Sequence, residues 1–430
     1  VGSEMCIRDR CGIIGYSGPK EPLPILISGL SRLEYRGYDS AGVALIDGDN
    51  LSIEKKEGKL SVLKEHLEGT SIKGNIGIGH TRWATHGVPS DVNAHPHADN
   101  ANEFAIIHNG IIENYAELKD DLIQDDYSFI SETDTEVVAV ELSRKWNGEL
   151  LDTVLDVAKS LDGTYALVVT STKQPGTIVA GRMMSPLVLG VGEGEVFLAS
   201  DSAAILEYTN KMIFLENGDF VEINDGNFTL YDIEKNEITR DIQVIDWEVS
   251  EAEKAGHDHF MYKEILEQAE VIERTIAGRI EKNSTEIPIH LDKAKKFEKI
   301  WIVACGTAYH AGLFGKDLFE KVLGVPVSVE LASEFRYREP IIGKNDLAIV
   351  ISQSGETMDT IAATELLKEN GSHVLALVNV VGSSLARMAD SVFYLHVGPE
   401  IGVASTKAYL GMLVGPVSYT HLTLPTTYEV

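Results

Sequence analysis

The sequence predicts an α+β portion followed by an α/β portion. From Cys11 to about Gln243 the apolar runs are short and mostly linked by turns, which is typical of antiparallel sheets packed with helices. From about residue 297, buried-type apolar runs alternate with helical stretches, which is typical of a parallel sheet with helices on both faces. Composition shifts divide the chain into a foreign-looking leader, a first domain, a connector, a second domain and a foreign-looking tail: 1–10, 11–243, 244–296, 297–416 and 417–430.

Bulk composition limits the class of protein. A chain of 430 residues is too long for one ordinary hydrophobic core. Its net charge of −29 argues against general binding to nucleic acid or to an anionic membrane, although a small anionic ligand needs only a local cluster of donors. The three cysteines are scattered, which argues against a disulfide framework. No apolar run reaches the roughly 18 residues that span a bilayer, and the N-terminal residues lack the apolar core of a secretory signal peptide. We therefore expect a cytoplasmic protein without disulfides.

The first domain is expected to begin with a strand at Cys11 and a helix over 23–33, where apolar residues recur on one helical face. Further strands are expected at Ala41–Ile46, Ile76–His80, Ala105–His108, Ala166–Thr170, Thr177–Ala180, Leu187–Val191 and Val196–Ala199. Two more helices are expected at Glu113–Leu122 and Thr135–Trp146, the second with several candidate N-caps between Ser131 and Glu136.

The rest of the chain follows a different pattern. Polar and acidic segments surround one long helical stretch, Phe260–Ile280, which we expect to be a docking helix. Buried strands are then expected at Ile300–Ala304, Val325–Glu330, Leu347–Ser352, Val374–Val378 and Val392–Leu395, with helices such as Thr360–Glu369 between them. The two ends are out of character, and the Thr-rich tail interrupts a helical pattern. They are expected to be foreign or mistranslated, the alternative being ordinary frayed termini.

Three segments near the front supply a nucleophile and an oxyanion site. Cys11 offers a thiol, and Asn109 with the N–H of Gly110 offers donors for an oxyanion. In one known solution the base is the α-amino group of the same cysteine, whose pKa near 8 suits physiological pH. Arg82 would then bind a substrate carboxylate in a bidentate fork and Asp134 an α-ammonium.

Each of these residues also has a simpler interpretation. Cys11 could be a buried core residue, Asn109-Gly110 a turn, and Arg82 a surface charge. His80 and His86 could form a metal pair, but no acidic or Cys partner has suitable spacing, and His95-Pro-His97 is expected to be structural. We expect no metal and no cofactor.

Two strand-to-helix junctions in the second domain carry hydroxyl groups. Thr307 follows the first strand, and the stretch 352–357 follows the third. Such junctions lie at the carboxyl ends of parallel strands, where helix N-termini present N–H groups to anions. Two matched junctions favour a phosphate site, whereas one alone would be read as helix capping.

Long motifs in the first domain resemble the glutaminase half of the glutamine–fructose-6-phosphate aminotransferase family, also called the glucosamine-6-phosphate synthases. The motifs are Cys11-Gly-Ile-Ile-Gly-Tyr, Leu33-Glu-Tyr-Arg-Gly-Tyr-Asp-Ser40, His80-Thr-Arg-Trp-Ala-Thr-His86, Asn93-Ala-His-Pro-His97, His108-Asn-Gly-Ile-Ile-Glu-Asn114 and Ser131-Glu-Thr-Asp-Thr-Glu136. The resemblance implies an N-terminal-nucleophile fold, a four-layer αββα sandwich. It implies glutamine binding by Arg82, Thr85, His86, Gly110 and Asp134, with Trp83 beside the route of ammonia.

The second domain resembles the first sugar-isomerase (SIS) domain of the same family, with a doubly wound parallel sheet. The resemblance places seven residues on its sugar-phosphate positions: Thr307, Ser352, Gln353, Ser354, Thr357, Val403 and Ser405. Ala308 departs from the pattern, because serine is usual there. The family has a second SIS domain with the catalytic Glu, His and Lys, and this chain ends before it, so we expect a C-terminally truncated fragment.

The resemblance implies conversion of L-glutamine and fructose 6-phosphate to glutamate and glucosamine 6-phosphate, by a homodimer when the enzyme is full length. Ten residues precede Cys11 here, so the printed chain is expected to lack glutaminase activity until this leader is removed. One alternative is a non-catalytic sugar-phosphate-binding module with an inactive front domain. Another is a different glutamine amidotransferase, such as a phosphoribosylamine-forming one, which the SIS motifs oppose.

Overall fold

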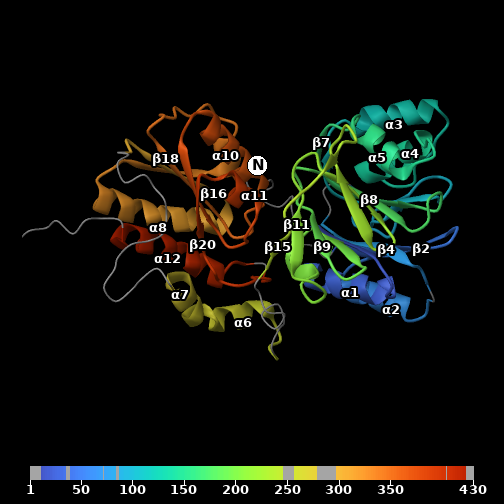
Figure 1. The fold of residues 1–430 in the computed structure, drawn as a ribbon, viewed down its shortest axis with the longest axis horizontal. Helices are drawn as coiled ribbons and strands as arrows, with labels where there is room; N and C mark the ends of the chain where they lie inside the picture. Colours follow the sequence, from blue (N-terminus) through green and yellow to red (C-terminus); the bar gives the residue numbers. More distant parts are fainter. Residues whose placement is uncertain are drawn as a thin grey trace, which may run out of the picture. The chain divides into compact units, whose positions relative to one another are not determined.

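The computed structural model describes residues 11–34, 39–70, 72–83, 87–245, 256–277, 297–402 and 404–422. The chain divides into two compact units, one formed by the described residues up to 245 and the other by those from 256 onward (Figure 1). Several expectations lie outside the described residues: the leader 1–10, the site residues Thr85, His86 and Val403, parts of the connector, and the tail from 423.

Two antiparallel sheets form the centre of the first unit. The eight-stranded sheet has the order β15-β11-β9-β10-β1-β4-β2-β3 and the seven-stranded sheet the order β14-β13-β12-β8-β7-β6-β5. The strands of the first sheet are β1 (Gly12–Ser17), β2 (Ser40–Asp47), β3 (Asn50–Glu57), β4 (Ile76–Arg82), β9 (Val188–Val191), β10 (Val196–Ala199), β11 (Lys211–Phe214) and β15 (Gln243–Val244). Those of the second are β5 (His97–Ala98), β6 (Phe104–Ile112), β7 (Gly163–Ser171), β8 (Thr177–Met183), β12 (Phe220–Asn224), β13 (Asn227–Tyr231) and β14 (Glu237–Ile238).

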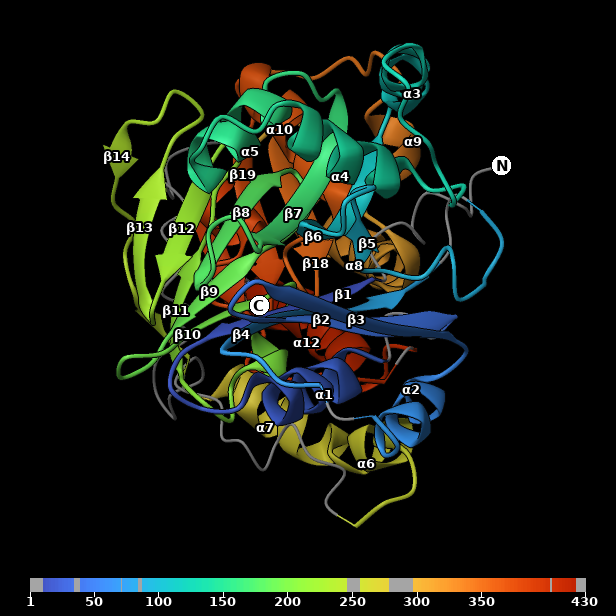
Figure 2. The same cartoon turned by 90° about the vertical axis from the view of Figure 1, so that its right-hand side faces the viewer.

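The two sheets pack face to face, and helices cover their outer faces (Figure 2). The layer between the sheets is a continuous apolar core drawn from strands of both, with Ile13, Ile78 and Ile107 among its buried members. Helix α1 (Pro22–Leu33) covers the eight-stranded sheet, and α4 (Asp134–Arg144) with α5 (Leu150–Ala158) covers the other. The remaining helices of this unit are α2 (Leu60–Leu67) and α3 (Tyr115–Gln124), with a short 3-10 turn at Ser202–Ala204. The expected four-layer αββα sandwich is therefore confirmed.

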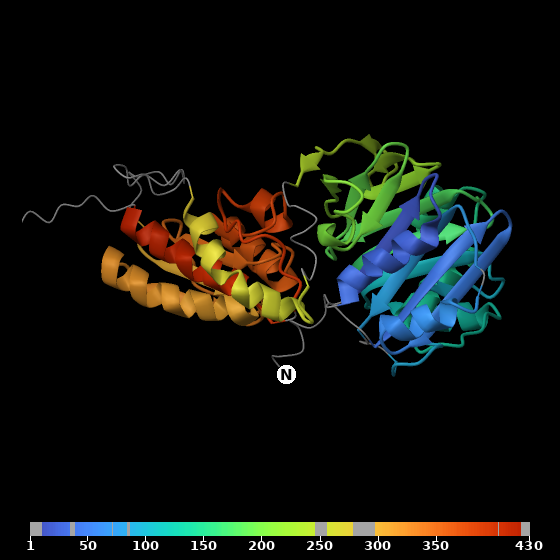
Figure 3. The same ribbon diagram turned by 90° about the horizontal axis from the view of Figure 1, so that it is seen from below.

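The second unit is a five-stranded parallel sheet with the order β17-β16-β18-β19-β20. Its strands are β16 (Ile300–Ala304), β17 (Val327–Leu331), β18 (Leu347–Ser352), β19 (His373–Val378) and β20 (Ser391–Tyr394). Helices α8 (Gly306–Leu323) and α12 (Lys407–Leu422) pack side by side on one face (Figure 3). Helices α9 (Ala332–Phe335), α10 (Met358–Glu369) and α11 (Ser384–Met388) cover the other face. The doubly wound α/β architecture is confirmed.

Two expectations about helices are wrong. The long helix expected from residue 260 is instead two short ones, α6 (Phe260–Leu266) and α7 (Gln268–Ile276), which Glu267 separates. The expected break at residue 416 does not occur, since the backbone of α12 continues to Leu422 with Pro416 inside it. Tyr, Ser and Thr lower helix propensity only slightly, so they do not by themselves end a helix that has already formed. Among the described residues, no helix is both long enough and apolar enough to span a bilayer.

Candidate active site

Polar side chains replace apolar ones at one end of the core between the two sheets. Successive side chains of a strand point to opposite faces, so residues two apart share a face. The inward rows therefore continue from the core into Cys11, which directly precedes β1, into His80 and Arg82 of β4, and into Asn109 of β6. The apolar members of these rows are Ile13, Ile78 and Ile107. Strand alternation thus gathers a thiol, an imidazole, a guanidinium and an amide in one place.

The main chain of Trp83 holds the sulfur of Cys11. Gly12 pairs with Thr81 in the antiparallel register of β1 and β4, which brings Cys11 beside the end of β4. The Trp83 N–H donates to Cys11 Sγ at 3.3 Å, and the Trp83 carbonyl oxygen lies 3.6 Å from the same sulfur. Cys11 is half-buried, so it is not the enclosed core cysteine of the simpler interpretation. An N–H aimed at sulfur stabilises its thiolate form.

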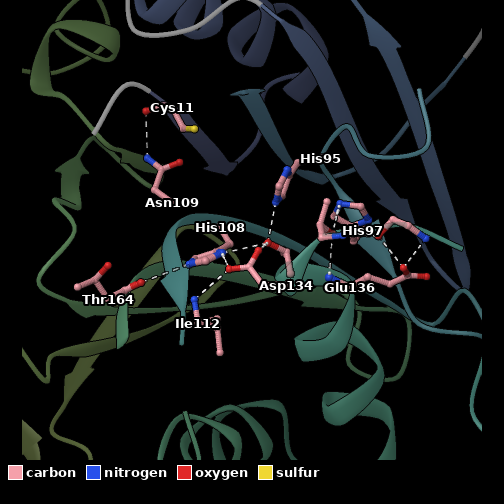
Figure 4. A network of polar contacts seen from close by, with 12 residues as sticks. Cys11, His95, His97, His108, Asn109, Ile112, Asp134, Glu136 and Thr164 are labelled. Carbon is pink, nitrogen blue, oxygen red and sulfur yellow. Dashed lines mark hydrogen bonds and ion pairs between the residues drawn. The ribbon is translucent and has the colours of Figure 1, made fainter. Parts of the chain in front are cut away.

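Asn109 and Gly110 lie inside β6, so they do not form the plain turn of the simpler interpretation. The Asn109 Nδ2 group donates to the carbonyl oxygen of Cys11 at 3.1 Å (Figure 4). Gly110 has a φ of +127°, and a Cβ atom at this position would overlap the carbonyl oxygen of Thr164 in β7. Only glycine fits here without strain, and it leaves the backbone beside Asn109 accessible.

Two buried charges lie in the same region of the unit. Arg82 is only 3% exposed, so it is not the surface charge of the simpler interpretation, and one of its Nη2 bonds goes to the carbonyl oxygen of Gly87 at 3.3 Å. Burial lowers the pKa of the Arg82 guanidinium, while negative charge at Asp39, Cys11 and Asp134 opposes this effect. A buried guanidinium can bind a carboxylate strongly through two parallel hydrogen bonds.

Asp134 is the first residue of α4, where the helix dipole favours an acidic side chain. The Thr133 hydroxyl caps this helix by accepting from the Glu136 N–H at 3.3 Å. One Asp134 oxygen accepts from the N–H of Ile112 in β6 at 2.9 Å, and the whole residue is 5% exposed (Figure 4). These contacts fix the carboxylate against the same strand that carries Asn109.

Four buried histidines form a cluster that reaches Asn109 through His80: His80, His95, His97 and His108. The rings of His80, His95 and His97 are in contact in series, tilted with centroids 4.4 Å apart in the first pair and edge-on with centroids 4.7 Å apart in the second. Thr135 Oγ1 joins His95 Nε2 at 2.8 Å to His108 Nδ1 at 3.0 Å. Burial lowers the pKa of His80 to about 3, so this ring is neutral near pH 7. Within the described part of the chain, no group of three or more His, Cys, Asp or Glu residues could hold a metal ion.

Both hydroxyl-bearing junctions of the second unit lie at the same edge of its sheet. Strands β16 and β18 are parallel neighbours, and Ala304 pairs with Ile351, so Thr307 and Ser352 follow adjacent strand ends. Thr307 is exposed in the first turn of α8. Ser352 Oγ accepts from the Gly355 N–H at 3.0 Å and lies 3.1 Å from the Thr357 hydroxyl.

The rest of the junction loop is similarly ordered. Ser354 Oγ accepts from the N–H of Glu356 at 3.1 Å, and the Gln353 carbonyl oxygen accepts from the Asn379 N–H at 3.1 Å. Gln353, Ser354 and Thr357 remain partly exposed at the edge where helix α10 begins. The loop therefore has a backbone fixed by its own hydrogen bonds, with the hydroxyl-bearing residues Ser354 and Thr357 partly exposed.

Ser405 belongs to a turn that the connector helices hold in place. Both oxygens of the buried Glu264 in α6 accept from backbone N–H groups of this turn, Ile401 at 2.6 Å and Gly402 at 3.0 and 3.1 Å. On the other side, Glu400 accepts from the Thr406 N–H at 2.8 Å. Ser405 is partly exposed, while its Oγ atom is buried.

A buried ion pair joins the same two segments. Lys407, the first residue of α12, lies 2.6 Å from Glu267, the residue that separates α6 from α7. Lys407 is 2% exposed. The break in the expected long helix therefore coincides with the residue that binds the start of α12.

Several residues that hold the site residues in place are not predicted by the sequence. His80 was considered only as a metal ligand, and Glu264, Glu400 and Lys407 were given no role. For His80 a signal was present, because it precedes Arg82 by two residues on an expected strand and so shares its face. For Glu264 there was none, since its partners are backbone groups 137 and 138 residues away.

A thiol at the edge of an αββα double sheet, beside a buried arginine and a strand amide, defines a glutamine amidotransferase domain. A parallel doubly wound sheet with hydroxyl-rich strand ends follows it. In agreement, a family model for the glutamine amidotransferase domain matches residues 65–245, and one for the SIS domain matches residues 293–415.

Close relatives share this domain pair. The chain is 51% identical over 408 residues to a glutamine–fructose-6-phosphate aminotransferase [isomerizing] of Caldanaerobacter subterraneus, a match that covers 94% of this chain and 67% of the relative. It is 48% identical over 403 residues to the protein of the same name from Aquifex aeolicus, with the same coverage. The chain belongs to the glutamine–fructose-6-phosphate aminotransferase (isomerizing) family.

Two solved structures are similar to this chain over part or most of its length. One is the C-terminal domain of glucosamine-fructose-6-phosphate aminotransferase from Francisella tularensis, at 39% identity and a TM-score of 0.38, covering 40% of this chain and 49% of that one. Another is glutamine phosphoribosylpyrophosphate amidotransferase from B. subtilis, at 19% identity and a TM-score of 0.49, covering 90% of each chain.

Proposed function

We propose that the first unit hydrolyses the amide of L-glutamine and that the second binds the sugar phosphate that receives the ammonia. In the complete reaction, fructose 6-phosphate becomes glucosamine 6-phosphate. The observation that carries the first part is the pair of contacts on Cys11. Its sulfur lies 3.3 Å from the Trp83 nitrogen, and its carbonyl oxygen accepts from Asn109 at 3.1 Å.

The chemistry follows from these positions. The Cys11 thiol gives its proton to a base, and the sulfur attacks the carboxamide carbon of glutamine. Asn109 Nδ2 and the Gly110 N–H stabilise the oxyanion, which collapses to a thioester as the base returns the proton to the departing ammonia. Water then attacks the thioester and releases glutamate. The base is the α-amino group of Cys11, which exists only when the peptide bond to Arg10 is cut.

The two charges of the amino acid substrate need fixed partners. Buried Arg82 supplies the cation for the α-carboxylate, and buried Asp134 supplies the anion for the α-ammonium. Thr85, His86 and the backbone of Gly110 complete this glutamine site in our proposal. Trp83 lies beside the route by which ammonia leaves.

In the second unit, the proposed sugar-phosphate ligands lie at the carboxyl edge of the parallel sheet: Thr307, Ser352, Gln353, Ser354, Thr357, Val403 and Ser405. Hydroxyls and helix N-terminal N–H groups bind phosphate without requiring a lysine. Titration of the chain with glucosamine 6-phosphate in a calorimeter tests this site. Saturable binding that Ser354→Ala weakens is expected, and the absence of heat in the parent chain would contradict the proposal.

Glutamate release from glutamine tests the first unit. We expect turnover from a chain that begins at Cys11, none from its Cys11→Ala variant, and none from the chain with ten residues before Cys11. N-terminal mass spectrometry must accompany the assay, because trimming would free the amine. Inactivity of the chain that begins at Cys11 would refute the proposed glutaminase. Full turnover with all ten residues still attached would refute the role of the α-amine.

A sugar-phosphate-binding module with an inactive front domain is the second candidate. It predicts binding of glucosamine 6-phosphate with no glutaminase activity from either chain. The homodimer and the cytoplasmic location expected from the sequence stay predictions, and light scattering of the purified chain tests the first.

A further inference from the structure

We infer that His80 is a positioning residue for glutamine hydrolysis, because its ring holds the Asn109 amide with Nδ2 facing the oxyanion. This inference rests on the proposed glutaminase function. His80 itself does not touch the reacting atoms in the proposed reaction. It acts through Asn109, the side chain with which its Nε2 atom makes a 2.8 Å contact.

The hydrogen-bond pattern fixes which end of the amide faces Cys11. His80 Nε2 meets Asn109 Oδ1, which can only accept, so Nε2 must carry the proton. The other end, Nδ2, donates to the carbonyl oxygen of Cys11 at 3.1 Å. A flipped amide would set its Oδ1 atom against the carbonyl oxygen of Cys11, so that two acceptors would face each other. The contact with Cys11 therefore favours one orientation of the amide, and a proton on His80 Nε2 supports the same orientation.

The same arrangement leaves a donor for the substrate. An amide NH₂ group has two hydrogens, and the carbonyl oxygen of Cys11 takes one of them. The second hydrogen is available for the oxygen that becomes negative when the thiol attacks. Asn109 thus joins the backbone of the nucleophile to the oxyanion site, and His80, by donating to Oδ1, holds the amide with its hydrogen atoms toward that site.

The surroundings of His80 leave its ring little freedom. The residue lies in β4 between β1 and β2, paired with Ile13 on one side and Gly42 on the other, and it is fully buried. Its ring packs on that of His95 at a centroid distance of 4.4 Å. Burial keeps the ring neutral near pH 7, so it carries a single N–H, and the contact with Asn109 Oδ1 uses that N–H at Nε2.

The test compares three variants of the chain that begins at Cys11. His80→Met fills similar space without a donor, and His80→Gln restores an N–H close to the position of Nε2. His97→Met is the matched control, because His97 belongs to the same buried cluster but bonds the Thr133 hydroxyl rather than Asn109. For each variant, kcat and KM for glutamine and the inhibition constant of glutamate are measured.

Removing an oxyanion donor outright costs about 100-fold to 1,000-fold in kcat, so misplacing one should cost less. We expect His80→Met to lower kcat by about 10-fold to 100-fold, while KM and the glutamate inhibition constant stay within about threefold. His80→Gln should recover most of kcat, and His97→Met should keep it within about threefold.

Three outcomes would overturn the inference. His80→Met could keep kcat, His80→Gln could fail to recover it, or His97→Met could lose as much. An inactive parent would instead refute the proposed function. In that event, ¹⁵N chemical shifts of histidine-labelled protein still decide the contact. A ring protonated at Nε2 supports it, and a ring protonated at Nδ1 contradicts it.

Discussion

The substitution Glu264→Ala should loosen the turn that carries Ser405 and so weaken sugar-phosphate binding. The Glu264 side chain is 2% exposed, and its carboxylate accepts from the N–H groups of Ile401 and Gly402. Alanine would leave both donors without this partner. Because the two groups are far apart in sequence, the substitution also removes a tie between α6 and the turn.

The magnitude follows from the two lost donors. A buried N–H left without a partner costs about 1 to 3 kcal/mol, so Glu264→Ala should destabilise the second unit by about 3 kcal/mol after partial relaxation. Glu270→Ala is the matched control, because Glu270 lies in α7 and forms an exposed pair with Arg274 at 3.3 Å. Exposed pairs of this kind contribute little.

Urea unfolding followed by circular dichroism, together with calorimetric titration of glucosamine 6-phosphate, measures both effects. We expect a lower midpoint and weaker binding for Glu264→Ala, with Glu270→Ala close to the parent. If Glu264→Ala matched Glu270→Ala in both measurements, the Glu264 carboxylate would not be what holds the turn, and the reasoning would be refuted.

Three further predictions concern single positions. Gly110→Ala should abolish glutamine turnover and destabilise the first unit by about 3 kcal/mol, because the added Cβ overlaps a strand carbonyl oxygen. The control Gly148→Ala is also at positive φ but in open space, and should cost about 1 kcal/mol. Turnover assays and urea unfolding midpoints check both variants. Between pH 6.5 and about 3 the His80 ring binds a proton in the unfolded chain but not in the folded one. The free energy of unfolding should therefore fall by about 1.4 kcal/mol per pH unit on acidification through this range. Unfolding measurements at several pH values should show a smaller slope for His80→Met. Gly355→Ala should weaken binding of glucosamine 6-phosphate, because the added Cβ overlaps a serine hydroxyl. The control Gly371→Ala is also at positive φ but has no such clash, and should bind like the parent in calorimetry. Equal binding by both variants would contradict the prediction.

Local sequence pattern predicted the elements whose apolar runs are short and clearly bounded. The strands expected at Val196–Ala199, Ile300–Ala304 and Leu347–Ser352 occur with those bounds, because β-branched runs between polar or glycine residues favour buried strands. The polar edge strand β3 and the helix α2 were not expected. Such elements bury few side chains, so their pattern is weak, and their sheet and core partners stabilise them.

Local sequence pattern predicts the identity of the site residues but not their contacts. Cys11, Arg82 and Asn109 carry recognisable chemistry, and strand alternation places each of them on an inward face. Which face meets which is a property of sheet pairing. The contact of His80 with Asn109 joins residues 29 apart from different sheets, and no spacing rule predicts it.

The sequence by itself determined the chemical groups of this protein and the order of its two architectures, because residue types and apolar periodicity are local properties. Only the tertiary structure decided which backbone groups those side chains meet: Trp83 N–H on the sulfur of Cys11, and Glu264 on the turn before Ser405. The reason is physical. Burial obliges each polar group to find a partner, and the nearest partner is set by how sheets and helices pack rather than by distance along the chain.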